Sequence, residues 1–251
     1  TDGVVTFRRE IRLADIVYTY PGAGTLALNQ LNLAIQKGES VGFIGPSGSG
    51  KSTLVDVILG LLSPVGGQVV VDDQDIQTNL RAWQNQIGYV PQSIYLTDDT
   101  LRRNVAFGLP NQQIDDMAVK RAIQAAQLEE FAASLPNGLE TIVGERGVRL
   151  SGGQRQRIGI ARALYHDPAV LVLDEATSAL DTTTERSVMQ AVYALHGTKT
   201  IIIVAHRFST VKHCDRLYRL QDGRVVESGK PDSMMSSQPD PPVARETGIH
   251  K

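Results

Sequence analysis

Short stretches in which apolar and polar residues alternate open the chain. In residues 10–35 the apolar positions recur at about every second residue on either side of a segment rich in glycine and proline, which is typical of a small antiparallel sheet. Residues 40–44 form a compact apolar run, a glycine-rich turn follows, and residues 51–61 have the apolar spacing of a helix. The chain therefore places a strand, a glycine turn and a helix in the order that a phosphate site requires.

Beyond this point the period of the apolar positions changes several times. Helices are predicted over 101–135, 155–164 and 182–195, and strands over 68–71, 87–90, 169–173 and 200–204. Such alternation indicates an α/β fold in which helices cover a largely parallel sheet, with 101–135 as a helical insert. A β-hairpin is predicted around Asp222-Gly223. The chain after Gly229 has too few apolar residues to pack, so we expect a loose tail.

Composition narrows the class of protein. Apolar residues make up 41% of the 251 residues, and the formal net charge of −2 provides no broad positive field for holding nucleic acid. No apolar run is long enough to cross a bilayer, and the single cysteine, Cys214, fits a reducing cytoplasmic compartment. The chain begins at Thr1 without an initiator methionine or a signal-peptide pattern, so we expect it to be a piece of a longer polypeptide.

The glycine turn carries a complete phosphate-loop motif. Glycines let the backbone fold tightly enough for successive N–H groups to point at the β- and γ-phosphates, and the following helix adds its dipole. We expect Lys51 to neutralise phosphate charge and Ser52 to bind Mg²⁺ through its hydroxyl. A merely flexible turn is disfavoured because a strand and a helix flank the motif. The motif and the residue after it are Gly45, Pro46, Ser47, Gly48, Ser49, Gly50, Lys51, Ser52 and Thr53.

Two carboxylates follow the apolar strand at 170–173. Ligands of open α/β folds collect at the carboxyl ends of strands. We therefore expect Asp174 to hold Mg²⁺ through water and Glu175 to accept a proton from, or orient, the attacking water. Taken alone, an acid pair after a strand is more often the cap of a helix. The phosphate loop upstream favours the catalytic interpretation.

A second candidate anion site begins at Ser151. A serine hydroxyl and the amides of Gly152 and Gly153 precede a helix that carries several arginines, and a helix N-terminus attracts anions. The alternative is a capped helix with a solvated basic face. This second anion site has no lysine-bearing loop, so it could contact a nucleotide that is bound by another copy of the chain.

In order and spacing, these motifs resemble the Walker A, signature and Walker B motifs of the ATP-binding-cassette (ABC) family. The resemblance covers residues 11–229 and implies a P-loop NTPase (RecA-like) core with an N-terminal antiparallel β subdomain. It divides the chain into an ATPase domain over 1–229, with a helical subdomain at about 93–158, and a tail over 230–251. It also implies a head-to-tail homodimer around two ATP molecules. In that dimer one copy completes the ATP site of the other with Ser151, Gly152, Gly153 and Gln154.

Four further residues take their roles from this resemblance alone. Tyr20 matches the aromatic that stacks on adenine, and Gln92 the glutamine that reaches Mg²⁺ and the attacking water. His206 matches the switch histidine at the γ-phosphate, and Asp181 lies in a loop that crosses the dimer interface. Without the resemblance, Tyr20 would be a packing residue, Asp181 a helix cap and His206 a structural strand-end histidine. Lys51, Gln92, Glu175 and His206 are thus the expected catalytic residues.

Residues 141–147 resemble a loop of ABC exporters, where it meets membrane helices, and 101–108 resemble the exporter sequence after the glutamine loop. The alternative for Glu145 and Arg146 is a solvated surface ion pair. The resemblance implies an ATPase on the cytoplasmic face of the cell membrane, fused behind a transmembrane domain whose substrate it exports or flips. Lipid-linked saccharide, lipid, peptide and drug substrates all remain open.

Two other classes of function are weighed against this one. A soluble relative that clamps nucleic acid would fit a basic surface or a long heptad arm, and the sequence has neither. A module that binds ATP without hydrolysing it is disfavoured because Glu175, Gln92 and His206 are all present.

Overall fold

An antiparallel sheet forms at the start of the chain, as the alternating pattern predicts. The computed structural model describes residues 7–144 and 147–235. It pairs β1 antiparallel with two neighbours, and the strands lie in the order β2 (Leu28–Gln36), β1 (Glu10–Tyr18), β4 (Gly66–Val71) and β5 (Gln74–Asp75). A bulge near Asp15, whose φ is 50°, shifts the alternation by one residue. Ile16 therefore faces the core after Leu13.

A second, six-stranded sheet is mostly parallel, which confirms the α/β prediction. Only the hairpin strand β12 runs antiparallel to its neighbour β11. The order across the sheet is β12 (Arg224–Gly229), β11 (Arg216–Gln221), β3 (Ser40–Ile44), β10 (Thr200–Val204), β9 (Val170–Asp174) and β6 (Ile87–Val90).

Both faces of this sheet are buried, and its central strands divide two hydrophobic cores. Ile201 and Ile203 of β10 belong to one core, while Ile202 and Val204, which point the other way, belong to the second. The first core extends into the helical region, and the second packs α1 (Lys51–Ile58) against the antiparallel sheet. Burial on both faces explains why the strand reads as an unbroken apolar run.

The predicted helix after the glycine turn ends earlier than residue 61. Gly60 takes a left-handed conformation with φ 68°, and Leu61 N–H donates back to the Asp56 carbonyl. This is the hydrogen-bond pattern of a glycine-terminated helix, so α1 stops at Ile58.

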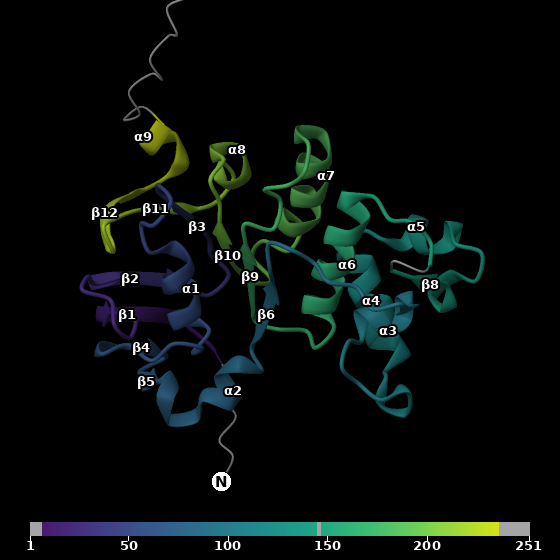
Figure 1. Cartoon of the computed structure of the whole chain (residues 1–251), viewed down its shortest axis with the longest axis horizontal. Coiled ribbons are helices and arrows are strands. Elements are labelled where there is room, and N and C mark those ends of the chain that lie inside the picture. Colours follow the sequence, from purple (N-terminus) through teal and green to yellow (C-terminus); the bar gives the residue numbers. More distant parts are fainter. Residues whose placement is uncertain (1–6, 145–146, 236–251) are drawn as a thin grey trace, which may run out of the picture.

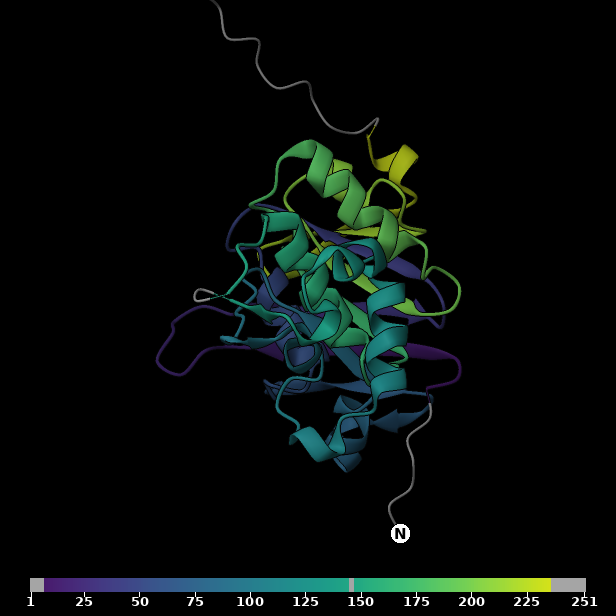
Figure 2. The same cartoon turned by 90° about the vertical axis from the view of Figure 1, so that its right-hand side faces the viewer.

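The insert predicted over 101–135 is helical but broken into short pieces. Figure 1 shows these teal helices beside the sheets, and Figure 2 views the molecule from their side. On α4 Met117 is exposed, while Ala118 and Ala122 are buried. The pieces are α3 (Leu101–Val105), α4 (Asp116–Ala125) and α5 (Glu129–Ser134), and the helix predicted over 155–164 follows as α6 (Gly152–Leu164).

A two-stranded sheet that was not predicted ties this insert together. β7 (Asp99–Thr100) pairs with β8 (Ile142–Val143), and β8 lies inside the segment 141–147 that resembles the exporter loop. Glu145 and Arg146 lie outside the described residues. The remaining helical turns are Ile76–Asn79, α2 (Leu80–Gln84), Asn111–Gln113 and Gly138–Glu140.

Three helices follow β9 along the chain. They are α7 (Thr182–Tyr193), α8 (Phe208–Val211) and α9 (Pro231–Met235). The prediction of a loose tail from residue 230 is wrong for its first turn, because α9 buries Met234 in the first core. Residues 236–251 lie outside the described part of the chain. No helix in that part is long and apolar enough to span a membrane.

Candidate functional site

The phosphate loop is a tight turn between β3 and α1. Gly50 has φ 101° and Gly48 has φ 77°, both in the left-handed region that favours glycine. A Cβ added to Gly50 would lie 2.7 Å from the Ala27 carbonyl oxygen, so the backbone fills the space that a side chain would need. The glycines let the backbone turn tightly at this point, which suits close approach of a phosphate.

Lys51 begins α1 and is only 5% exposed. Its Nζ donates hydrogen bonds to the carbonyls of Gly45 and Pro46, at 3.0 and 2.9 Å. Burial lowers the pKa of the ammonium group, while the nearby carboxylates Glu175 and Asp174 oppose this effect. The structure thus holds a desolvated cation inside the loop, where an anionic group would be attracted strongly.

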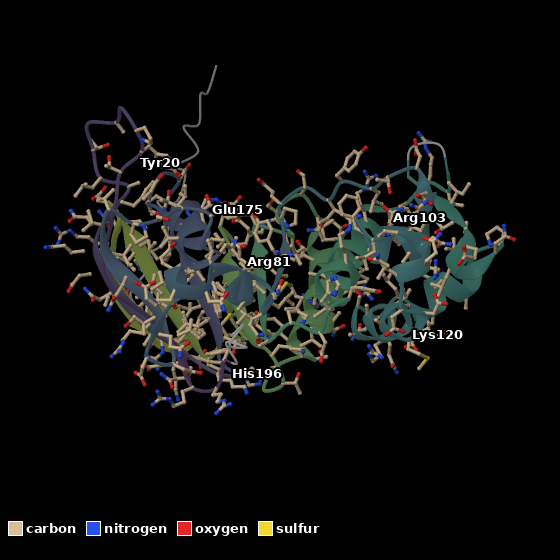
Figure 3. The ribbon with its side chains drawn as sticks, turned by 90° about the horizontal axis from the view of Figure 1, so that it is seen from below. Tyr20, Arg81, Arg103, Lys120, Glu175 and His196 are labelled. Atoms are coloured by element: carbon tan, nitrogen blue, oxygen red, sulfur yellow. The ribbon has the colours of Figure 1, made fainter. Side chains whose placement is uncertain are left out.

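Residues from five separate segments line one cleft of about 270 Å³ beside this loop. Tyr20 lies at its rim, and the Tyr20 hydroxyl is 3.1 Å from Thr53 Oγ1. Figure 3 shows Tyr20 and Glu175 on the same edge of the molecule, with His196 toward the opposite edge. The lining residues are Tyr20, Ala27, Ser47, Gly48, Gly50, Lys51, Ser52, Thr53, Glu175 and His206.

Glu175 and His206 form a close pair in this cleft. His206 Nε2 lies 2.6 Å from Glu175 Oε1, and the Glu175 side chain is 18% exposed. Glu175 has φ 50°, and its N–H donates to the Val204 carbonyl, so the residue leaves β9 in a sharp turn held by β10. A non-glycine residue in this region costs free energy, and such strain is common at functional sites. The turn aims the carboxylate into the cleft.

Asp174 ends β9 just outside the lining of this cleft. Tyr89 donates a hydrogen bond from its hydroxyl to Asp174 Oδ2 at 3.2 Å, while the buried Oδ1 has no hydrogen-bond partner. Burial raises the pKa of Asp174, although the Tyr89 hydrogen bond opposes this rise. A buried carboxylate oxygen without a partner fits a role in holding a hydrated cation.

The oxygen donors near the phosphate loop suit Mg²⁺, since Ser52 and Asp174 offer a hydroxyl and a carboxylate. The described residues contain no group of three or more histidine, cysteine, aspartate or glutamate side chains that could by themselves hold a metal ion. A cation here would therefore depend on few protein ligands, as Mg²⁺ bound with a nucleotide usually does. Gln92 does not line the cleft; its amide donates to Ser178 Oγ at 3.2 Å.

The loop after Glu175 is fixed by hydrogen bonds that the side chains of Asp181 and Arg207 make. Asp181 caps α7 by accepting from the amides of Thr183 and Thr184, and these hydrogen bonds lower its pKa, that from Thr184 most. Arg207 donates to the carbonyl of Leu180 and to Glu185 Oε2. Asp181 therefore acts as the helix cap that was the alternative at this position.

The signature motif lies apart from the phosphate loop within this chain. Ser151 Oγ accepts from the Gln154 amide and the Gln154 side chain accepts from the Ser151 N–H, which is a complete capping box for α6. Ser151, Gly153 and Gln154 line a different cleft, of about 260 Å³, which shares no lining residue with the first. Gly152 takes no part in that lining.

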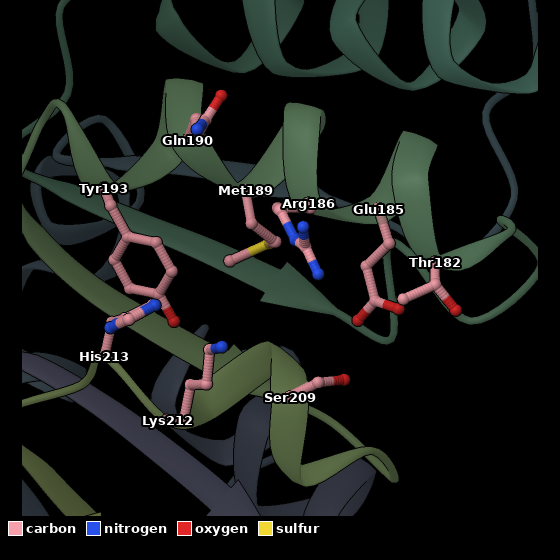
Figure 4. A pocket seen from close by; sticks show the side chains of 9 residues that line it. All are labelled: Thr182, Glu185, Arg186, Met189, Gln190, Tyr193, Ser209, Lys212 and His213. Atoms are coloured by element: carbon pink, nitrogen blue, oxygen red, sulfur yellow. The ribbon is translucent and has the colours of Figure 1, made fainter.

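A further cleft, of about 180 Å³, lies between α7 and α8 and is shown in Figure 4. Arg186, Lys212 and His213 line it together with Met189 and Tyr193. None of the residues expected to bind ATP or Mg²⁺ belongs to this lining. The cleft is thus distinct from the candidate site.

Comparison with known proteins gives consistent results. A family model described as "ABC transporter" matches residues 28–178. The chain is 42% identical over 224 residues to an ATP-dependent lipid A-core flippase of Ralstonia nicotianae, a match that covers 88% of this chain and 38% of the flippase. It is 40% identical over 210 residues to the ABC transporter ATM1 of Toxoplasma gondii, covering 83% of this chain and 18% of that protein. A solved bacterial Atm1-family ABC exporter with ATP bound superposes with a TM-score of 0.82 at 35% identity, covering 92% of this chain and 40% of the exporter chain. The chain thus spans less than half the length of these relatives.

Proposed function

This chain belongs to the ABC transporter family and is an ATPase of that family, and we propose that it binds MgATP in the cleft of Tyr20, Lys51, Glu175 and His206. One observation carries the proposal. Three segments far apart in sequence bring the buried Lys51, the strained Glu175 and His206 to one cleft. We assign the ATPase domain to residues 1–229 together with the short helix α9, which packs on its core, and a helical subdomain to about 93–158.

The phosphate loop would hold the β- and γ-phosphates through its backbone N–H groups. Lys51 would exchange its hydrogen bonds with the loop carbonyls for phosphate oxygens, and Tyr20 at the rim would stack on the adenine. Ser52, Asp174 and, after a movement of its loop, Gln92 would hold Mg²⁺, which neutralises developing phosphate charge.

Glu175 would act as the base or the orienting group for the attacking water. The hydrogen-bonding distance between His206 and Glu175 supports a site in which both side chains would contact the γ-phosphate and the water together. Hydrolysis here consists mainly of positioning and charge stabilisation, so a fixed carboxylate is more useful than a mobile one.

The separate location of the signature motif supports a head-to-tail homodimer. Within one chain Ser151 lies in a different cleft from Lys51, so a site that uses both needs two copies. Ser151, Gly152, Gly153 and Gln154 would then present a helix N-terminus to the γ-phosphate held by the partner. Asp181, at the start of α7, would lie near this contact. ATP would thus join the two copies.

The remainder of the full-length protein would contain a transmembrane domain, because similar full-length proteins are exporters and flippases more than twice as long. A cleft of about 490 Å³ lined by Ile87, Tyr89, Arg162 and His166 would receive a helix from that domain. Tyr95 and Phe107 are exposed apolar side chains in segments joined to Arg162. The chain would then lie on the cytoplasmic face of the membrane and power export or flipping, with a lipid-linked substrate as the first to test.

Replacing the proposed base tests the function directly. Glu175→Gln should lower the rate of phosphate release from MgATP by about 100-fold or more, because it removes a general base while keeping the side chain's shape. Binding of MgATP should persist, and light scattering should detect a dimer at high protein concentration. Glu129→Gln, on the exposed side of α5, is the matched control. Wild-type turnover in Glu175→Gln would contradict the assignment.

A further inference from the structure

Tyr89 occupies a place beside the candidate metal site that the motifs do not explain. It lies on β6, the edge strand of the parallel sheet, opposite Val172 of β9. Since β9 ends at Asp174, the neighbouring strand brings the tyrosine hydroxyl to the carboxylate. Among the described residues, Tyr89 is the only side chain that donates a hydrogen bond to Asp174.

The two oxygens of Asp174 are thereby placed in different situations. Oδ2 accepts from Tyr89 at 3.2 Å, and Oδ1 is buried without a partner. The positive charge of Lys51 acts on Asp174, but the Lys51 ammonium group donates its hydrogen bonds to the loop carbonyls and not to this carboxylate. The tyrosine thus restricts the rotation of the carboxylate and leaves one oxygen free to accept from a hydrated cation.

We propose that Tyr89 is a positioning residue for Asp174, and that it sets the Mg²⁺ concentration at which the site holds MgATP. The inference rests on the proposed function, because it assumes that Asp174 serves Mg²⁺. The tyrosine does not line the nucleotide cleft itself. The residue is 38% exposed and lines the cleft of Ile87 and Arg162.

Two effects of the hydroxyl oppose each other. By donating to the carboxylate, it withdraws negative charge and weakens the attraction for a cation. By fixing the carboxylate plane, it removes the entropy cost of ordering Asp174 when the cation binds. Loss of the partner that orients a metal-binding carboxylate usually costs 10- to 100-fold in metal affinity, so the orienting effect outweighs the other.

Equilibrium binding of trinitrophenyl-ATP to Tyr89→Phe, titrated with Mg²⁺, tests the proposal. The variant keeps the ring and removes only the hydroxyl. We expect half-saturation at about ten-fold higher Mg²⁺ than in the wild type. Binding of the nucleotide in EDTA should be unchanged. Mn²⁺ binding followed by electron paramagnetic resonance should weaken by the same factor.

Tyr95→Phe provides the matched control, because Tyr95 is 72% exposed and holds Arg162 through its backbone carbonyl rather than its hydroxyl. This variant should show wild-type Mg²⁺ dependence. Equal Mg²⁺ dependence in Tyr89→Phe and wild type would overturn the inference. It would also be overturned if Tyr89→Phe lost as much nucleotide affinity in EDTA as in Mg²⁺, because that result would indicate general damage to the site. Absence of any Mg²⁺-dependent binding in the wild type would instead contradict the proposed function.

Discussion

Two glycines of the phosphate loop differ in what surrounds them. Both have positive φ, but a Cβ on Gly48 would meet open space, whereas one on Gly50 would lie 2.7 Å from the Ala27 carbonyl oxygen. We therefore expect Gly48→Ala to cost only the conformational strain, about 1 kcal/mol of unfolding free energy. Gly50→Ala should cost about 2 kcal/mol more, because the backbone must also move. Urea unfolding of both variants measures the difference, and equal costs would contradict the structure of the loop.

Cys214 is a buried thiol with no role in the site. Burial raises its pKa to about 12, so the reactive thiolate is scarce at pH 8. We predict that dithiobisnitrobenzoate labels the folded protein far more slowly than the protein unfolded in urea. Since this is the only cysteine of the chain, the unfolded sample is a complete internal control. Rapid labelling of the folded protein would show that the thiol is accessible.

Individual residues were predictable from sequence where the motif itself includes them. Lys51, Glu175 and His206 were expected together, and they line one cleft or form one pair. Tyr89 and Arg207 were not singled out, because their roles depend on which strands lie side by side. The strand order β9–β6 puts Tyr89 beside Asp174, and no local spacing encodes that neighbour.

At the scale of elements, Arg207 joins the turn before α8 to the loop before α7. It donates to the Leu180 carbonyl and to Glu185, whose side chain is only 5% exposed and also accepts from Thr210. Arg207→Met would leave a buried carboxylate without its cation. Because Arg207 itself is about half exposed, we expect a loss of about 2 kcal/mol, below the usual cost for a fully buried pair.

The second half of this experiment separates charge from packing. Adding Glu185→Gln to Arg207→Met removes the unpaired charge and keeps a hydrogen-bonding side chain of the same size. The double variant should regain more than half of the lost stability, measured by urea unfolding in the same buffer. If the two losses simply add, the ion pair is not what holds the two segments together.

The boundaries of elements were harder to predict than their order. Every strand of the six-stranded sheet was expected, since four are short apolar runs and the other two form the hairpin predicted around Asp222-Gly223. The end of α1 depends on the left-handed turn at Gly60, and the β7–β8 pair joins residues more than forty positions apart. The short helix α9 depends on the burial of Met234, a contact that its polar neighbours conceal.

At the scale of the whole molecule, the two proposed anion-binding sites belong to different parts of the fold. The phosphate loop joins strand β3 of the six-stranded sheet to helix α1, and the Ser151 turn begins α6 in the helical region. Each lines its own cleft. A homodimer with twofold symmetry would bring the loop of one copy to the turn of the other twice, forming two equivalent sites.

Mixing two inactive variants distinguishes such shared sites from sites within one chain. Lys51→Ala disables the phosphate loop, and Ser151→Arg places a bulky cation at the second turn. Each homodimer then has two defective sites. A mixed dimer instead gathers both defects into one site and leaves the other complete. If sites are shared, the equimolar mixture should recover about a quarter of the wild-type rate of phosphate release, since half of randomly assorted dimers are mixed and each has one intact site.

Protein concentration provides the control for this mixing experiment. The recovered rate per chain should rise with concentration until dimerisation saturates, because a dilute mixture contains few dimers of any kind. Mixing Lys51→Ala with itself at the same total concentration should recover nothing. Should the mixture of the two variants also stay inactive while the wild type is active, each chain must use its own loop without the partner's Ser151 turn, and the shared site is excluded. Recovery would mean that ATP hydrolysis depends on contact between copies.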